Sequence, residues 1–265
     1  MTEASKIKVR ALSECGVLIT GGTSGVGLAT AIQFAAAGVT RIGLVGRNQA
    51  RGQQARDAVL KLSPDTQVEF IAADANQIDQ AVRAAEQAKA KLGSIDVLVN
   101  STVAAYVPIL FHDMPIADIE PTMVQQIMAP LLMCRIVLPW MRERGGGAII
   151  NIASDAAKVT TPGETVLGAA MAAITMFSRT LAMEAKRNGV RVNAVTPSVI
   201  EGTLTYDRVH QSAFSSKLFE KVARMAHLGI VQPDDLAALI VFLASPQAAR
   251  MTGQVISVNG GISAG

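Results

Sequence analysis

The chain has 265 residues, half of them hydrophobic, with a mean hydropathy of +0.34 and a formal net charge of only +3. That length suits one domain with a sizeable core, so we expect a single domain over residues 1–265. The small charge, with no Lys/Arg cluster and few aromatic residues, argues against a nucleic-acid partner.

The two cysteines and the N-terminus indicate where the protein works. Cys15 and Cys134 are far apart and fit no metal or redox spacing, so we interpret them as two reduced, buried thiols and expect no metal. The first 14 residues are polar and lack the apolar core of a signal peptide. No apolar run reaches the roughly 18 residues of a membrane span. We therefore predict a cytoplasmic location and no membrane partner.

Short apolar runs alternate with helical patterns along the chain, which is typical of βαβ units and a parallel sheet. The expected strands are 17–20, 41–45, 68–72, 95–99, 149–152, 191–196 and 255–258. The expected helices are 26–37, 49–62, 78–92, 116–144, 165–186 and 234–244. Residues 197–228 have no regular pattern and are interpreted as a substrate lid.

A glycine-rich loop over residues 20–27 joins the first strand to the first helix. Glycines at such a junction allow a tight turn and let backbone N–H groups approach a pyrophosphate at the helix N-terminus. The candidate cofactor-binding residues in it are Gly21, Thr23, Ser24, Gly25, Val26 and Gly27. The alternative is that these glycines only tighten a turn.

The end of the second strand indicates which cofactor is preferred. A carboxylate there would bind the ribose hydroxyls of NAD, but this chain has Gly46 followed by Arg47. An arginine without that carboxylate suits a 2′-phosphate and predicts NADP(H) rather than NAD(H). An ordinary solvated arginine explains the residue equally well.

A buried strand ending at Ser154 is followed by a loop and a long apolar helix. This segment and the glycine-rich loop resemble the short-chain dehydrogenase/reductase family, and the resemblance extends from about Val17 to Gly261. It implies a Rossmann-like, doubly wound parallel sheet of about seven strands with helices on both faces. It also implies that Asp74 contacts the adenine and that Asn100, the first residue of the motif after the fourth strand, helps to bind the cofactor.

The same resemblance implies that most of the catalytic residues are missing. In the family, hydride transfer between nicotinamide and a carbonyl or carbinol carbon uses a serine, a tyrosine thirteen residues later and a lysine four residues beyond it. An asparagine in the preceding helix completes a proton relay. Ser154 is retained, but the other positions hold Leu167, Met171 and Gln126. No Tyr-x-x-x-Lys occurs elsewhere in the chain, so a shifted alignment does not restore the pair.

Several side chains could replace the missing acid/base pair. Tyr106, Tyr206, His210, Asp155 and Lys158 are the candidates, and each also has an ordinary packing or solvated role. Together they form no Ser-His-Asp, metal or paired-carboxylate arrangement.

The helix 165–186 is apolar on all sides and must be covered on all of them. In the family, this helix and the preceding long one build a four-helix interface with a second subunit. Our first hypothesis is a non-catalytic subunit paired with an active homologue or with itself, as a dimer or tetramer. That arrangement resembles heteromeric hydroxyacyl-CoA dehydrogenases with one degenerate subunit, such as that for hydroxybenzylsuccinyl-CoA.

Two other functions remain open from sequence. One is an atypical NADP(H)-dependent oxidoreductase that acts on a carbonyl or alcohol with a non-standard proton donor. The other is a different reaction in the same cleft, for which no residue set is apparent. The sequence also leaves open that the cleft holds no cofactor.

Overall fold

The computed structural model describes residues 9–209 and 212–264, and its centre is a seven-stranded sheet. All neighbouring strands run parallel, in the order β3-β2-β1-β4-β5-β6-β7. The strands are β1 Gly16–Thr20, β2 Arg41–Gly46, β3 Gln67–Ala72, β4 Val97–Asn100, β5 Gly147–Ile152, β6 Val190–Pro197 and β7 Val255–Val258. The strand order reverses direction between β1 and β4, where such sheets bind ligands at their carboxyl edge.

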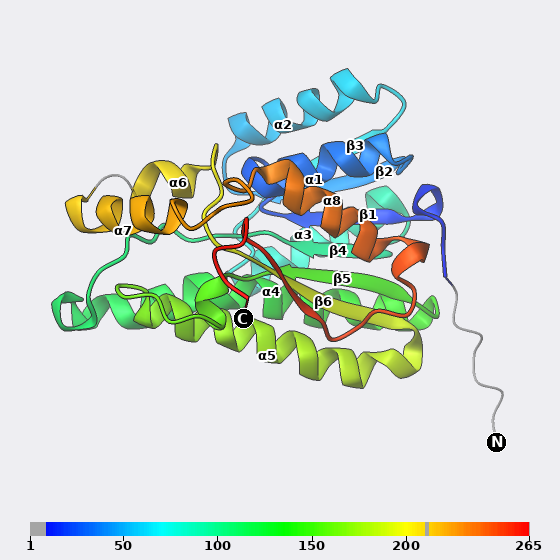
Figure 1. Ribbon diagram of the computed structural model, residues 1–265. Helices are drawn as coiled ribbons and strands as arrows, with labels where there is room; N and C mark the ends of the chain where they lie inside the picture. The colour runs from blue at the N-terminus through cyan, green and yellow to red at the C-terminus, as the bar shows by residue number, and fades with distance from the viewer. Residues whose placement is uncertain (1–8, 210–211, 265) are drawn as a thin grey trace.

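Helices cover both faces of this sheet (Figure 1). One face carries α1 Gly25–Ala36, α2 Gln49–Leu62 and α8 Pro233–Ala244. The other carries α3 Ile78–Leu92, α4 Ile119–Glu143 and α5 Thr165–Ala185. Two further helices, α6 Leu204–Val209 and α7 Ala213–Ala223, extend from one end of the sheet. The predicted fold class, a doubly wound α/β sheet of about seven strands, is confirmed.

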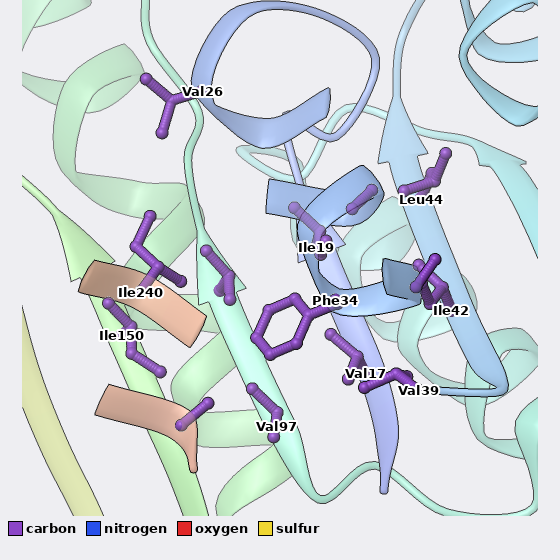
Figure 2. Packing of buried hydrophobic residues seen from close by; sticks show 14 of the residues in the cluster. Val17, Ile19, Val26, Phe34, Val39, Ile42, Leu44, Val97, Ile150 and Ile240 are labelled. Carbon is purple, nitrogen blue, oxygen red and sulfur yellow. The ribbon is translucent and has the colours of Figure 1, made fainter. Parts of the chain in front are cut away.

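The core lies between the sheet and each helical layer. Strand β1 is buried at all five positions, because a parallel sheet covered on both faces exposes neither side of its central strands. On the α1 side, the ring of Phe34 has no exposed surface and lies against apolar side chains from the strands (Figure 2). This core fixes the carboxyl ends of the strands relative to one another.

The described parts of the segment 197–228, residues 197–209 and 212–228, are more regular than the sequence predicted. They contain α6 and α7, and local side chains cap both helices. The Thr203 hydroxyl accepts a hydrogen bond from the N–H of Tyr206 at 3.2 Å, and the Ser212 hydroxyl accepts one from the N–H of Ser215 at 3.1 Å. Hydroxyl caps of this kind satisfy the first N–H groups of a helix. The mixed polarity of the segment gave no sign of the two helices.

Smaller differences concern helix ends. The expected helix 116–144 begins as a short 3-10 turn, Ile116–Asp118, before α4, and the expected helix 165–186 ends at Ala185 with a 3-10 turn, Lys186–Asn188, after it. Including these turns, both segments are long and apolar enough to cross a membrane by length and composition. That differs from the expectation that no run is long enough. In this fold both helices pack on the sheet and supply buried residues to the core.

Candidate active site

A cleft of about 290 Å³ lies at the carboxyl edge of the sheet. Its walls come from residues that end or follow β1, β2, β3, β4, β5 and β6, so one cavity joins segments far apart in the sequence. Its volume is near the lower end of the range for small-molecule sites, and its place at the reversal of strand order is the usual one.

The glycine-rich loop forms one wall of the cleft. Gly21 has a φ of +69°, and a Cβ there would lie 2.2 Å from the carbonyl oxygen of Ser101. A Cβ on Gly27 would lie 2.2 Å from the carbonyl oxygen of Gly21. Neither position has room for a side chain, so the loop backbone itself faces the cleft at the start of α1. The predicted residues that line it are Gly21, Thr23, Ser24, Gly25 and Val26, while Gly27 packs behind the loop.

Two arginines and an aspartate lie at the far end of the same cleft. Arg47, Arg51 and Asp74 all line it. The Nη1 of Arg47 is 3.9 Å from Oδ2 of Asp74, and the Arg47 side chain is 66% exposed, so this ion pair leaves the guanidinium accessible. Arg51 was not predicted. It is on the first turn of α2, where the side chain of Asn48 accepts a hydrogen bond from the N–H of Arg51 at 2.9 Å.

The loop and the two arginines fit a dinucleotide. The glycine backbone and the N-terminus of α1 suit a pyrophosphate, and the arginines suit an additional phosphate. Asp74 is held by the N–H of Asn76, which donates to its Oδ1 at 3.0 Å.

Asn100 is not where its predicted role requires, because it lies beneath the cleft and does not line it. Its side chain is 2% exposed and belongs to a buried hydrogen-bonded chain. The Thr20 hydroxyl donates to Oδ1 of Asn100 at 3.1 Å, and Nδ2 of Asn100 donates to Oδ1 of Asn151 at 2.8 Å. Nδ2 of Asn151 then donates to the Ser178 hydroxyl at 2.9 Å. Asn100 therefore ties β1, β4, β5 and α5 together.

The opposite end of the cleft contains the four positions that the family uses for chemistry. Ser154, Leu167, Met171 and Gln126 all line it, so the alignment of these positions is consistent with the structure. The Ser154 hydroxyl accepts a hydrogen bond from the N–H of Ala156 at 3.2 Å, which leaves its own hydrogen to donate. Leucine and methionine offer no proton. Gln126 is 2% exposed, and its Nε2 and Oε1 have no hydrogen-bond partner among the described residues.

Two of the candidate replacements are held by other contacts. Oδ1 of Asp155 accepts a hydrogen bond from the Ser257 hydroxyl at 3.1 Å, and Oδ2 accepts from the Ser263 hydroxyl at 2.8 Å and from Nδ2 of Asn259. Lys158 donates to the same Ser257 hydroxyl and is 3.7 Å from Asp155. Both side chains fasten the C-terminal segment and are absent from the cleft lining.

The tyrosines and the histidine have different positions. Tyr106 lines the cleft, its hydroxyl donates to the carbonyl oxygen of Gly163 at 2.7 Å, and burial raises the pKa of this phenol to about 12. Tyr206 lines the cleft from α6. His210 lies outside the described residues.

An acid that the sequence reasoning overlooked lies at the reacting end. Glu164 lines the cleft and precedes the first turn of α5, three residues before Leu167 and seven before Met171. Burial raises the pKa of its carboxyl from 4.5 to about 7, and a hydrogen bond from Thr161 opposes that shift. The signal available in the sequence was that Glu164 is an acid close to Leu167 and Met171, the positions of the missing pair.

Within the described part of the chain, no group of three or more His, Cys, Asp or Glu side chains could hold a metal ion. Both cysteines are buried and free. Ser154, Gln126 and Glu164 are polar side chains that line the reacting end of the cleft.

Comparisons with known proteins agree with this geometry. Residues 21–263 match the family model described as enoyl-(acyl carrier protein) reductase. The chain is 33% identical to D-threitol dehydrogenase of Mycolicibacterium smegmatis over 98% of each sequence. It is also similar to a solved structure of 7α-hydroxysteroid dehydrogenase complexed with NADH and 7-oxo glycochenodeoxycholic acid (TM-score 0.85, 28% identity, 95% of each chain).

A further solved structure is similar to this chain over nearly its whole length. It is the NADPH-bound short-chain oxidoreductase of Pseudomonas aeruginosa PAO1, described as containing an atypical catalytic centre. The two chains superpose with a TM-score of 0.87 and 27% identity, over 96% of this chain and 99% of the other.

Proposed function

The chain belongs to the short-chain dehydrogenase/reductase family of oxidoreductases, and from this premise we propose that it is an atypical NADP(H)-dependent enzyme that interconverts a carbonyl and an alcohol. The observation that carries the proposal is that the glycine loop, the arginines and Ser154 line one continuous cleft. A nicotinamide nucleotide bound there would supply or accept the hydride. The proton donor is a group other than the family's tyrosine.

The chain's own residues have distinct roles in this proposal. The backbone of the glycine loop binds the pyrophosphate, and Arg47 with Arg51 binds a 2′-phosphate, which favours NADP(H) over NAD(H). Ser154 donates a hydrogen bond to the substrate oxygen and holds it in place. Leu167, Met171 and Val199 make this end of the cleft apolar and exclude water from it.

Cofactor binding can be tested without knowing the substrate. NADPH titrated into the purified protein should enhance and blue-shift nicotinamide fluorescence, with tighter binding than NADH. No binding at millimolar NADPH would eliminate the oxidoreductase proposal. Turnover should then be sought with NADPH and a panel of β-keto esters and α-diketones, and with NADP⁺ and the matching alcohols.

The non-catalytic subunit remains the second candidate, and a specific surface favours it. On α5, exposed residues recur at alternating spacings of four and three and form one stripe: Ala169, Ala173, Met176, Thr180 and Met183. Met176 and Met183 are each 59% exposed. A helix face of this kind favours close packing against another helix, from a second copy or an active homologue. A hydroxyacyl- or ketoacyl-processing partner, CoA-linked or not, would then carry the chemistry.

Copurification separates the two candidates. An affinity-tagged chain expressed in its native host should be isolated, and its partners identified by mass spectrometry. A homodimer with NADPH-dependent turnover supports the atypical enzyme. A stable complex with a homologue that has an intact Ser-Tyr-Lys set, and no turnover by this chain alone, supports the non-catalytic subunit. The free, buried thiols fit the cytoplasm, where we place the protein.

A further inference from the structure

Glu164 is the N-cap residue of α5, directly before the helix that carries the two positions that lost their function. Leu167 and Met171 are four residues apart on α5 and share one face of the helix, and Glu164 lies just before its first turn. All three line the cleft together with Ser154. The helix start is also close to the Ser154 segment, because a Cβ on Gly168 would lie 2.9 Å from the carbonyl oxygen of Ala156.

The backbone at Glu164 is held by four hydrogen bonds. The preceding carbonyl, that of Gly163, accepts from the Tyr106 hydroxyl at 2.7 Å and from the N–H of Ile109 at 3.0 Å. The N–H of Glu164 donates to the carbonyl of Thr161 at 3.1 Å, and the Glu164 carbonyl accepts from the N–H of Gly168 at 2.6 Å. A side chain that starts from so fixed a backbone can hold a proton at a defined place.

The groups around the Glu164 carboxyl leave it able to take up a proton near neutral pH. Among the described residues it forms no ion pair, and its polar neighbours are Thr161 and Tyr106. Helix α6 contributes Tyr206 and Arg208 to the cleft. Asp155 and Lys158 are engaged with the C-terminal segment. Burial raises the pKa of Glu164 to about 7, which is the range in which a carboxyl serves as both acid and base.

Three further segments border this site: helix α7, helix α4, and the end of β6 with the loop after it. Helix α7 packs against Gly163 through Phe214, and its charged residues are Lys217, Glu220 and Lys221. Helix α4 contributes Gln125 and Gln126 to the cleft, and both are uncharged. The end of β6 and the loop after it contribute the uncharged residues 197–200.

We propose that Glu164 is the proton donor and acceptor at this cleft, in place of the family's tyrosine, with Ser154 holding the reacting oxygen. This assignment rests on the proposed oxidoreductase function. In reduction, the substrate carbonyl carbon gains a hydride from the reduced nicotinamide nucleotide, and the C=O π pair moves to oxygen. That oxygen takes the proton of the Glu164 carboxyl, whose O–H electron pair stays on the carboxylate. The products are the alcohol and the oxidised nucleotide, and water reprotonates Glu164.

Gln126 is a second observation that points to a ligand at this end. Its amide is buried, lines the cleft and has no described partner for either polar atom. A buried amide left in this state costs free energy unless a ligand or water pairs with it. A substrate with a further donor or acceptor beside its carbonyl, such as a β-keto or hydroxyacyl compound, would satisfy it.

The first experiment needs neither substrate nor cofactor. The protein is labelled with ¹³C at the glutamate carboxyl, and each resonance is followed by NMR from pH 4 to 9. One carboxyl should titrate near pH 7 in the wild type and in Glu86→Gln, an exposed position on α3, and be missing in Glu164→Gln. If every glutamate titrates in the ordinary range, the assignment is overturned.

The second experiment measures the reaction. With NADPH and the reducible probe from the panel above, Glu164→Gln should lower kcat by about 10²- to 10⁴-fold with an unchanged NADPH Kd. Glu164→Asp should recover part of the rate, and the wild-type rate should fall as pH rises through about 7. If Glu164→Gln keeps the wild-type rate and pH profile, only the assignment of Glu164 fails. If the wild type binds NADPH but reduces none of the panel, both proposals fail.

Discussion

Glu164 should make the stability of the protein depend on pH. The pKa of its carboxyl is raised to about 7 in the folded protein from 4.5, so between these values the folded state binds more protons than the unfolded state. Preferential protonation of the folded state therefore stabilises the protein at low pH. The free energy of unfolding decreases as pH rises from about 4.5 to about 7 and stays at the lower value above that. Glutamine cannot ionise.

We expect the difference in Tm between Glu164→Gln and the wild type to shift in favour of the variant as pH increases from 5 to 8. Differential scanning calorimetry at several pH values measures this, with Glu86→Gln as the control. A Tm difference that is constant over this pH range would contradict the burial of the carboxyl.

Arg47 should contribute to the choice between the two nucleotides. Its guanidinium faces the cleft and is 66% exposed, and it is 3.9 Å from Asp74, so it has donors left for a phosphate. A charge-assisted hydrogen bond is worth about 1.5–3 kcal/mol. Arg47→Ala should thus raise the NADPH Kd about tenfold or more and leave the NADH Kd unchanged.

Titration followed by nicotinamide fluorescence provides both constants. Arg83→Ala, an exposed position on α3, is the matched control. Equal weakening for both nucleotides would show that Arg47 does not recognise the 2′-phosphate.

Individual residues also show where sequence reasoning reached its limit. Ser154, Leu167, Met171 and Gln126 were placed from the family spacing, and all four line the cleft. Asn100 was misassigned because an asparagine at a strand end looks the same whether it faces a ligand or a buried neighbour. Glu164 was missed because an acid just before a helix is ordinary there: it complements the helix dipole.

At the scale of elements, the exposed stripe of α5 should mediate self-association or pairing with a homologue. Replacing Met176, which is 59% exposed, by glutamate puts a charge into any interface there. The expected result is a smaller assembly in size-exclusion chromatography with light scattering. Leu62→Glu, at a 66% exposed apolar position on α2, should leave the mass unchanged.

Two outcomes would exclude this stripe as an interface. One is a monomeric wild type that recovers no homologue in copurification. The other is a Met176→Glu variant that keeps the wild-type mass.

Most helices and strands could be predicted from the sequence, because periodicity reports burial directly. The alternation of apolar runs and amphipathic stretches located every strand of the sheet within two residues at each end. The helices α6 and α7 were not predicted, because their starts depend on the hydroxyl caps of Thr203 and Ser212 rather than on an apolar stripe. Arg51 escaped notice for a related reason, since only the turn fixed by Asn48 brings it to the cleft.

At the scale of the whole molecule, Asp155 is one of the contacts that join the C-terminal segment to the rest, beside the pairing of β7 with β6. Its carboxylate accepts hydrogen bonds from Ser257, Asn259 and Ser263, is 3.7 Å from Lys158, and is 4% exposed. Asp155→Ala would remove the acid beside the Lys158 ammonium and an acceptor that Ser257, Asn259 and Ser263 share.

Removing one partner from a buried charged group costs about 3–5 kcal/mol, and we expect a loss of about 3 kcal/mol here. Urea unfolding followed by circular dichroism should show a lower midpoint with an unchanged slope. Asp57→Ala, an exposed position on α2, serves as the control. A midpoint equal to that of the wild type would mean that this carboxylate contributes little to stability.

The carbonyl of Gly163 receives two donors from the 101–110 loop, the hydroxyl of Tyr106 and the N–H of Ile109. Any molecule that displaces this loop from the cleft must break both hydrogen bonds, and the beginning of α5 would then lose these two contacts. Ligand entry would then be reported by faster deuterium uptake at the amides of residues 164–168, even for a compound that is never chemically transformed.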